Sequence, residues 1–219
     1  MNAEVLLSGY TENTQELVFR VYSTELSAEE RCKSHALEHL TAHDLLGAAL
    51  LQDFGLRHVK ITRRGLEKPV LLHENLHMNL SHCKGLAVAA VGRFPLGVDC
   101  ERPRAVKDRL LDKICAESEA AAIRAQTDKN FAFARFWTLK EAYGKYTGEG
   151  IRAPLRALRF SLSEDGIRPF FPGAEELLFF QMILQDQHII SLCLPKHPLR
   201  VESAYRILSC AAADRSDCS

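Results

Sequence analysis

The chain has no excess of either charge, because its 219 residues include 28 lysines and arginines and 28 aspartates and glutamates. Proteins that bind nucleic acids or anionic membranes usually carry a basic excess, so this balance argues against both kinds of partner. No apolar run approaches the roughly 20 residues needed to cross a bilayer. Residues 1–20 also lack the basic-then-apolar pattern of a secretory signal. We therefore expect a cytoplasmic protein.

The chain also lacks any pairing pattern among its seven cysteines, which are scattered and include no Cys-x-x-Cys. We expect free thiols in a reducing compartment, most of them serving as small core residues. The composition is 47% apolar and 26% charged, as is ordinary for a globular protein. A chain of this length buries roughly 70% of its unfolded surface, which is enough for a proper core. The cysteines are Cys32, Cys83, Cys100, Cys115, Cys193, Cys210 and Cys218.

Hydrophobic periodicity predicts a mixed chain in which a long helix is followed twice by a run of strands. The two halves are alike in outline, so an interrupted duplication is possible, although no repeat is visible at the level of residues. Predicted helices span residues 27–53, 106–115, 117–126 and 131–147. Predicted strands span residues 16–22, 58–62, 70–72, 77–83, 85–92, 96–101, 157–163, 176–184, 188–194 and 201–208. We expect residues 209–219 to form a frayed tail.

The helix predicted over residues 131–147 carries the most informative pattern. Glu141 and Lys145 lie four residues apart and point away from its apolar stripe, while Lys140 lies at the stripe's edge, an awkward place for an ammonium unless it reaches a cleft. Gly148 and Gly150 close the helix. A plain alternative is a surface Glu–Lys pair, worth about 0.2–0.5 kcal/mol. The stripe consists of Phe136, Leu139, Tyr143 and Tyr146.

Two carboxylates share one face of the strand predicted over residues 96–101. Alternation places Asp99 and Glu101 on the same side, roughly 7 Å apart. They repel each other unless a hard cation lies between them, and magnesium typically engages one or two carboxylates together with a substrate phosphate. The alternative is a solvated edge strand.

Two other patterns suggest different chemistry. Residues 35–39 have the H-x-x-E-H order of an inverted zinc-protease motif, in which His35 and His39 share a metal. His43 cannot readily complete such a site, because eight helical residues separate it from His35 by about 12 Å. Ser81 and His82 are neighbours on a strand and point to opposite faces, so they do not form a nucleophile–base pair. They fit a strand end that offers a hydroxyl and an imidazole to an anionic ligand. The alternative is a strand edge whose polar groups are hydrogen-bonded to water.

Four segments in register carry a resemblance to a known family. The first two are Glu67–Pro69, similar to G-K-P, and Met78–Cys83, similar to F-N-[IL]-S-H-S. Gly97–Glu101 has the form G-[IV]-D-x-E. Trp137–Lys145 has the form W-[ST]-x-K-E-[AS]-x-x-K and is followed by the G-x-G of Gly148–Gly150. Over about residues 27–163, the chain resembles the 4′-phosphopantetheinyl transferases of the larger, surfactin-synthetase type.

The resemblance implies an α+β fold, a pseudo-dimer of two similar halves with coenzyme A in the cleft between them. The halves would span residues 1–102 and 103–208. Asp99, Glu101 and Glu141 would hold a magnesium ion on the coenzyme's pyrophosphate. Lys145 would contact that pyrophosphate, with Lys140 close to it. The residues expected to meet the coenzyme's phosphates are Lys68, Pro69, Ser81, His82 and His43.

The implied activity is magnesium-dependent transfer of 4′-phosphopantetheine from coenzyme A to a serine of an acyl or peptidyl carrier protein, by a monomeric enzyme. Adenosine 3′,5′-bisphosphate would leave, and Glu141 would act as the base or only as a metal ligand. Glu67, His43 and Gln52 depart from the family pattern, which suggests weak or pH-dependent coenzyme binding. The alternatives are a coenzyme-binding protein without catalysis, a zinc hydrolase built on His35 and His39, and a purely structural origin of every motif.

Overall fold

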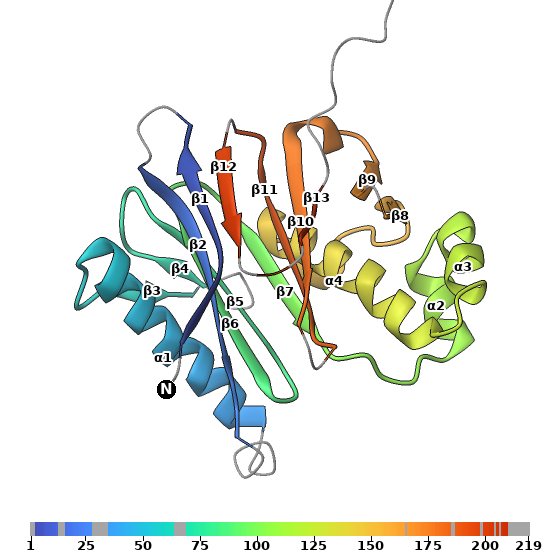
Figure 1. The fold of residues 1–219 in the computed structure, drawn as a ribbon, viewed down its shortest axis with the longest axis horizontal. Coiled ribbons are helices and arrows are strands. Elements are labelled where there is room, and N and C mark those ends of the chain that lie inside the picture. Colours follow the sequence, from blue (N-terminus) through green and yellow to red (C-terminus); the bar gives the residue numbers. More distant parts are fainter. Residues whose placement is uncertain are drawn as a thin grey trace, which may run out of the picture.

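The computed structural model describes residues 3–12, 16–27, 35–63, 69–164, 166–184, 187–197, 199–203, 205 and 207–209. Over these residues the protein is a mixed α+β fold in which two antiparallel sheets lie side by side (Figure 1). The expected α+β class is therefore confirmed. The predicted tail beyond Ser209 and the start of the first helix, residues 28–34, lie outside the described residues.

The first sheet has the strand order β12-β1-β2-β6-β5, and the helix α1 (His35–Phe54) packs on it. Gly55 has a φ of +67° and ends α1 where the sequence predicts. Leucines of α1 meet the side chains of Tyr22 and Met78 in a core of their own. The strands of this sheet are β1 (Glu4–Thr11), β2 (Leu17–Glu25), β5 (His77–Cys83), β6 (Leu86–Gly92) and β12 (Leu199–Ser203).

The second sheet has the strand order β13-β10-β11-β7, and it packs against α4 (Lys129–Thr147). Its strands are β7 (Gly97–Glu101), β10 (Leu177–Ile183), β11 (Ile189–Pro195) and β13 (Ile207–Ser209). The remaining elements are β3 (Ile61–Thr62) with β4 (Val70–Leu71), β8 (Arg159–Ser163) with β9 (Gly166–Phe170), and the helices α2 (Asp108–Ile114) and α3 (Glu117–Arg124). The helices α2 and α3 lie at the end of the molecule opposite α1 (Figure 1).

Two strands cross between the halves that the sequence suggests. β7 belongs to the first half in sequence but pairs with β11, so that Asp99 lies opposite Ser191. β12 belongs to the second half in sequence but pairs with β1. Each half therefore contributes a strand to the other half's sheet, and the two sheets are tied together at their edges.

Helix α4 ends where its sequence predicts and begins two residues before the predicted start. The Asp128 side chain accepts hydrogen bonds from the backbone N–H groups of Asn130 and Phe131, which is the usual role of an N-cap carboxylate. Gly148 closes the helix with a φ of +82°. Phe136 and Leu139 are buried, and Tyr143 and Tyr146 are partly buried against the same core, so the predicted stripe is confirmed.

Gly97 brings α4 close to β7. A Cβ atom at this position would lie 2.1 Å from the carbonyl oxygen of Ala142 and 2.4 Å from the backbone nitrogen of Tyr146. Only glycine permits this approach, because real Cβ contacts are much longer. The contact places Asp99, two residues along β7, against the face of α4 that carries the charged residues.

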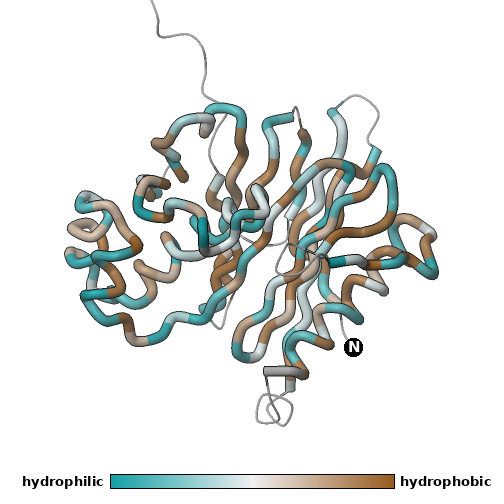
Figure 2. Tube along the Cα trace, turned by 180° about the vertical axis from the view of Figure 1, so that it is seen from behind, coloured by the Kyte–Doolittle hydropathy of each residue, from teal (hydrophilic) through white to brown (hydrophobic). Residues whose placement is uncertain are grey.

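Hydrophobic segments lie mainly in the strands of the two sheets, whereas the connection from β7 into α2 is more hydrophilic (Figure 2). Within the described part of the chain, no helix has both the length and the apolarity needed to span a membrane. The cysteines that fall among the described residues, Cys83, Cys100, Cys115 and Cys193, are free and buried, as expected.

Candidate active site

A lysine of α4 and a carboxylate of β7 form the centre of the site. The Nζ atom of Lys145 donates to Oδ1 of Asp99 at 2.8 Å and to Oγ of Ser81 at 2.9 Å. Asp99 is only 7% exposed, and this ammonium balances a charge that would be costly to bury alone. Three distant segments, in β5, β7 and α4, therefore meet at one charged contact.

Ser81 holds β5 against β7 rather than facing a cleft. Its Oγ atom donates to Oδ1 of Asp99 at 2.9 Å and accepts from the backbone N–H of Cys100 at 3.1 Å and from Lys145. A hydroxyl has one donor and two acceptor positions, so its hydrogen-bonding capacity is filled. The hydroxyl is also buried. A phosphate would have to displace one of these bonds to reach the hydroxyl, so the expected contact of Ser81 with a phosphate stays a prediction.

Glu141 lies one helical turn before Lys145, and its Oε1 atom is buried without a hydrogen-bond partner in the described structure. The pKa of this carboxyl is raised to about 7, chiefly by burial and also by the neighbouring Asp99, while Lys145 lowers it. A buried carboxyl group is costly when one of its oxygens has no hydrogen-bond partner and a second carboxylate lies nearby. Such a site suits either a proton or a cation.

Glu101 is the third expected metal ligand, and it also responds to Asp99. Burial raises its pKa, Arg104 opposes that shift, and Asp99 adds to it. The Nη2 atom of Arg104 lies 3.6 Å from Oε2 of Glu101. The charge of Asp99 therefore raises the pKa of both Glu101 and Glu141.

The chemistry of Asp99, Glu101 and Glu141 fits a hard divalent cation, because all three are carboxylates and they repel one another. One of them, Glu141, also has an oxygen without a hydrogen-bond partner. Among the side chains that the structure describes, no three His, Cys, Asp or Glu residues are already gathered tightly enough to enclose a metal ion. This agrees with the Asp99 contact, because Lys145 occupies the position at Oδ1. An ion at Asp99 would therefore have to share this carboxylate with Lys145 or displace it.

Lys140 does not belong to this cluster, and its contacts give no support to the expectation that it lies near a pyrophosphate. Its side chain is fully buried, with Nζ 2.8 Å from Oε2 of Glu119 and 2.8 Å from the carbonyl oxygen of Leu155. A third bond goes to the carbonyl oxygen of Leu158. The ammonium at the stripe's edge reaches into the core, where it ties α4 to α3 and to the segment before β8.

A separate group of histidines lies between α1 and β5. The ring centroids of His39 and His43 are 4.6 Å apart, and those of His39 and His82 are 5.7 Å apart. Nδ1 of His82 lies 3.9 Å from Oε2 of the buried Glu38, whose other oxygen accepts the backbone N–H of Gly85. Burial, followed by the neighbouring His39, lowers the pKa of His43, while Asp44 raises it.

In this geometry His43 and His82 each contact His39, between α1 and β5 rather than with Asp99. The geometry also gives Glu38 a structural contact in place of the catalytic one that a zinc-protease motif requires. The side chain of His35 lies outside the described residues.

The G-K-P-like segment is only partly visible. Lys68 lies outside the described residues, as does Glu67. Pro69 is half-buried immediately before β4. Their expected contacts with coenzyme phosphates remain predictions.

Sequence reasoning missed two buried residues that hold the elements around the site together. Oδ1 of Asn79 accepts the backbone N–H of Val98 at 2.7 Å, which joins β5 to β7 alongside Ser81. Glu119 is the buried partner of Lys140. Asn79 stands within the F-N-[IL]-S-H-S segment, so the motif itself was a signal, whereas nothing near Glu119 marks it as buried.

Comparison with known proteins agrees with the arrangement of β7 and α4. Residues 95–193, which contain both elements, match the model of the 4′-phosphopantetheinyl transferase superfamily. The chain is 31% identical over 162 residues to the 4′-phosphopantetheinyl transferase HetI of Nostoc sp.. This aligned region covers 68% of each of the two chains. The chain is 26% identical over 153 residues to the 4′-phosphopantetheinyl transferase ffp of Bacillus subtilis, covering 64% of this chain and 68% of that protein.

These matches show that the protein is a transferase. The chain belongs to the 4′-phosphopantetheinyl transferase superfamily. Within it, the similarity reaches the Sfp type. The chain is 24% identical over 199 residues to the transferase Sfp of Bacillus subtilis strain 168, covering 85% of this chain and 82% of that protein.

Proposed function

We propose that the protein transfers the 4′-phosphopantetheine group of coenzyme A to a serine of an acyl or peptidyl carrier protein, with the help of magnesium. The observation that carries the proposal is the contact of Lys145 with Asp99 beside the unpartnered carboxyl of Glu141. A lysine and a group of carboxylates in a partly buried site suit a reaction in which negative charge develops on a pyrophosphate.

In this proposal, Asp99, Glu101 and Glu141 would hold the magnesium ion. The ion would supply positive charge at the pyrophosphate when bound. Lys145 would add a second positive charge there, since its Nζ atom lies within the same cluster. Preorganised charges of this kind usually provide the largest catalytic contribution.

The bond changes are a single displacement. The carrier serine's oxygen forms a bond to the β-phosphorus of coenzyme A, the bond from that phosphorus to the bridging oxygen breaks, and adenosine 3′,5′-bisphosphate leaves. The hydroxyl proton must go to a base within hydrogen-bond reach or one water away. Glu141 is the group we assign to this role, because a pKa of about 7 lets it accept a proton near neutral pH.

We further propose that the chain is a pseudo-dimer with halves at residues 1–102 and 103–208, and that coenzyme A binds between them. Support comes from the two sheets, each with its own long helix, α1 and α4, and from the cluster where β5 meets β7. The histidine group of His43 and His82 would meet the coenzyme's 3′-phosphate. A monomeric cytoplasmic enzyme fits this proposal, and the free buried cysteines support a reducing compartment.

Two alternatives are weaker. A coenzyme-binding protein without catalysis would have no need for Glu141 to keep a buried, unpartnered oxygen beside Asp99. A zinc hydrolase on His35 and His39 would need Glu38 as its base, and that carboxylate accepts the N–H of Gly85 instead.

The test incubates the protein with coenzyme A, magnesium and several apo carrier proteins, and follows the mass of each carrier. We expect phosphopantetheine on the carrier's serine and no product on a carrier with that serine replaced by alanine. Coenzyme binding measured on the same sample separates the alternatives. Binding without modification of any carrier would establish the non-catalytic protein instead.

A further inference from the structure

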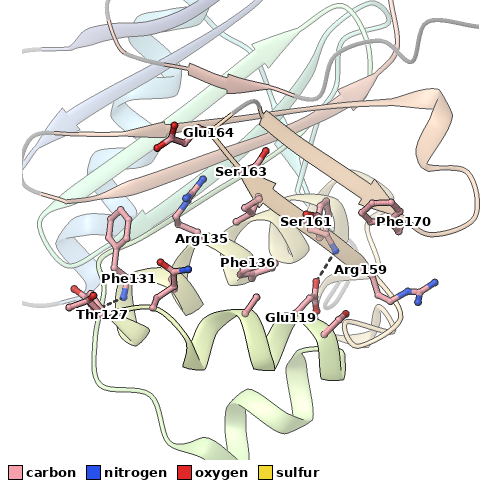
Figure 3. Close-up of a pocket in the computed structure, with 17 residues that line it drawn as sticks. Glu119, Thr127, Phe131, Arg135, Phe136, Arg159, Ser161, Ser163, Glu164 and Phe170 are labelled. Atoms are coloured by element: carbon pink, nitrogen blue, oxygen red, sulfur yellow. Dashed lines mark hydrogen bonds between the residues drawn. The ribbon is translucent and has the colours of Figure 1, made fainter. Parts of the chain in front are cut away.

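A cavity of about 670 Å³ lies far along α4 from the site above, between α3, α4 and the β8–β9 hairpin. Figure 3 shows Arg135, Phe131, Phe136 and Phe170 among the side chains that line it. The Phe170 side chain is 51% exposed, an unusual position for so large an apolar group. The cavity therefore combines aromatic walls with the partly buried guanidinium of Arg135 and the exposed one of Arg159, a pattern typical of small-molecule sites.

Arg135 is held in place by a buried polar network. Its Nε atom donates to Oε1 of Gln181 at 2.7 Å, and Nε2 of Gln181 returns a bond to the Arg135 carbonyl at 3.0 Å. Gln181 also donates to Oγ of Ser191, which shares a 2.7 Å hydrogen bond with Oγ1 of Thr138. The guanidinium is therefore fixed before any ligand arrives, which lowers the entropic cost of binding.

The same guanidinium has no counter-ion among the residues that the structure describes. Its Nη2 atom is buried without a hydrogen-bond partner there, and burial alone lowers its pKa, with no opposing carboxylate. A half-buried cation without a partner is costly. A negative group in the cavity would offset that cost through its charge, since Arg135 lines the cavity while its Nη2 atom itself is buried.

The acidic residues around the cavity limit what that group can be. Glu119 is already paired with Lys140, and Asp128 caps α4. Glu164 is an exposed residue that also lines the cavity (Figure 3). These charges disfavour a dianion such as a phosphate ester, and a monoanion costs less to desolvate between aromatic walls.

We propose that this cavity binds a small carboxylate carried on an apolar body, with the carboxylate on Arg135 and the apolar part against Phe131, Phe136 and Phe170. The site is separate from the one proposed for phosphopantetheine transfer. Its occupant is defined by chemistry, an amphiphilic monoanion.

The test measures the dissociation constants of octanoate, 1-octanol and octylammonium by titration calorimetry on the full chain. These probes share an eight-carbon body and differ in charge. We expect octanoate to bind at least about tenfold more tightly than 1-octanol, the ratio that about 1.4 kcal/mol of favourable charge contact gives. We expect octylammonium to bind more weakly than both.

Two variants assign the selectivity to a residue. R135Q should bind octanoate and 1-octanol equally, whereas R159Q, which removes the exposed arginine lining the same cavity, should keep the wild-type ratio. The comparison of the three probes on the wild-type protein does not depend on whether either variant folds. Equal binding of octanoate and 1-octanol by the wild type, no binding of any probe, or unchanged selectivity in folded R135Q would each overturn the proposal.

Discussion

The Nζ atom of Lys145 lies 2.8 Å from Oδ1 of Asp99, so a residue of α4 holds the carboxylate of β7 that the metal proposal also requires. The contact is only partly exposed, with the two side chains 24% and 10% accessible. Lys145 is therefore positioned to act both on Asp99 and, in the proposed reaction, on the pyrophosphate of coenzyme A.

Replacing this lysine should therefore impair transfer far more than folding. We expect K145M to lower kcat/KM for carrier modification by about 10²–10³, the usual effect of removing one preorganised charge. K129M removes an exposed lysine from the first turn of the same helix and should stay near the wild-type value. Equal activity of K145M and K129M would remove Lys145 from the mechanism.

The raised pKa of Glu141 predicts a stability that falls as pH rises. The carboxyl has a pKa of about 7 in the folded protein and an ordinary value of 4.5, so the folded state binds its proton more tightly. Its contribution is complete below about pH 4.5 and is lost as pH rises to about 7. E141Q should then be more stable than the wild type at pH 8 by about 1–2 kcal/mol, after discounting the shift for partial exposure.

Urea unfolding at pH 4.5 and pH 8 measures this difference, which should nearly disappear at the lower pH. E141Q should meanwhile be inactive. If E141Q is less stable than the wild type at both pH values, the raised pKa assigned to Glu141 is contradicted.

Lys140 and Glu119 should matter for folding and not for chemistry. K140M leaves the Glu119 carboxylate buried without its cation, which typically costs about 3–5 kcal/mol. The double variant K140M/E119Q removes that charge and should recover part of the loss. Thermal unfolding measures both effects, and kcat/KM measured below the unfolding transition should stay within a few-fold of wild type. A large loss of kcat/KM in a fully folded K140M would restore the catalytic interpretation.

Gly97 should tolerate no side chain. G97A places a Cβ atom 2.1 Å from the carbonyl oxygen of Ala142, and such overpacking costs about 1–3 kcal/mol. G47A makes the same change on α1, where nothing lies within 4 Å. It should stabilise the protein by up to about 1 kcal/mol through helix propensity. Chemical denaturation of the two variants therefore gives shifts of opposite sign, and matching shifts would argue against a close helix–strand contact.

Much of the fold is readable from local pattern. β5 is predicted at its observed bounds, and α4 is predicted to within two residues, because strict alternation and a clear apolar stripe define them. β1 was missed because it buries four consecutive residues, so it shows no alternation, and it contains Gly9. β9 is short and contains both Gly166 and Pro169, which local rules assign to turns.

The site was less predictable than the fold for a physical reason. The faces on which Asp99 and Lys145 lie follow from periodicity, but that they share one site was implied only by the family resemblance. The partners of Ser81 and Lys140 depend on which distant segment packs against each of them. Glu119 is 21 residues from Lys140, and no local pattern reports that the two are buried together.

The central claim is that Asp99, Glu101 and Glu141 serve one divalent cation during transfer. The most direct measurement is the rate of phosphopantetheine transfer to a carrier protein as a function of magnesium concentration, in the wild type and in D99N, E101Q and E141Q. We predict no transfer after chelation, recovery on adding magnesium, and a raised magnesium requirement or no activity in each variant. Transfer that persists with chelator, or three variants with the magnesium dependence of the wild type, would contradict the account.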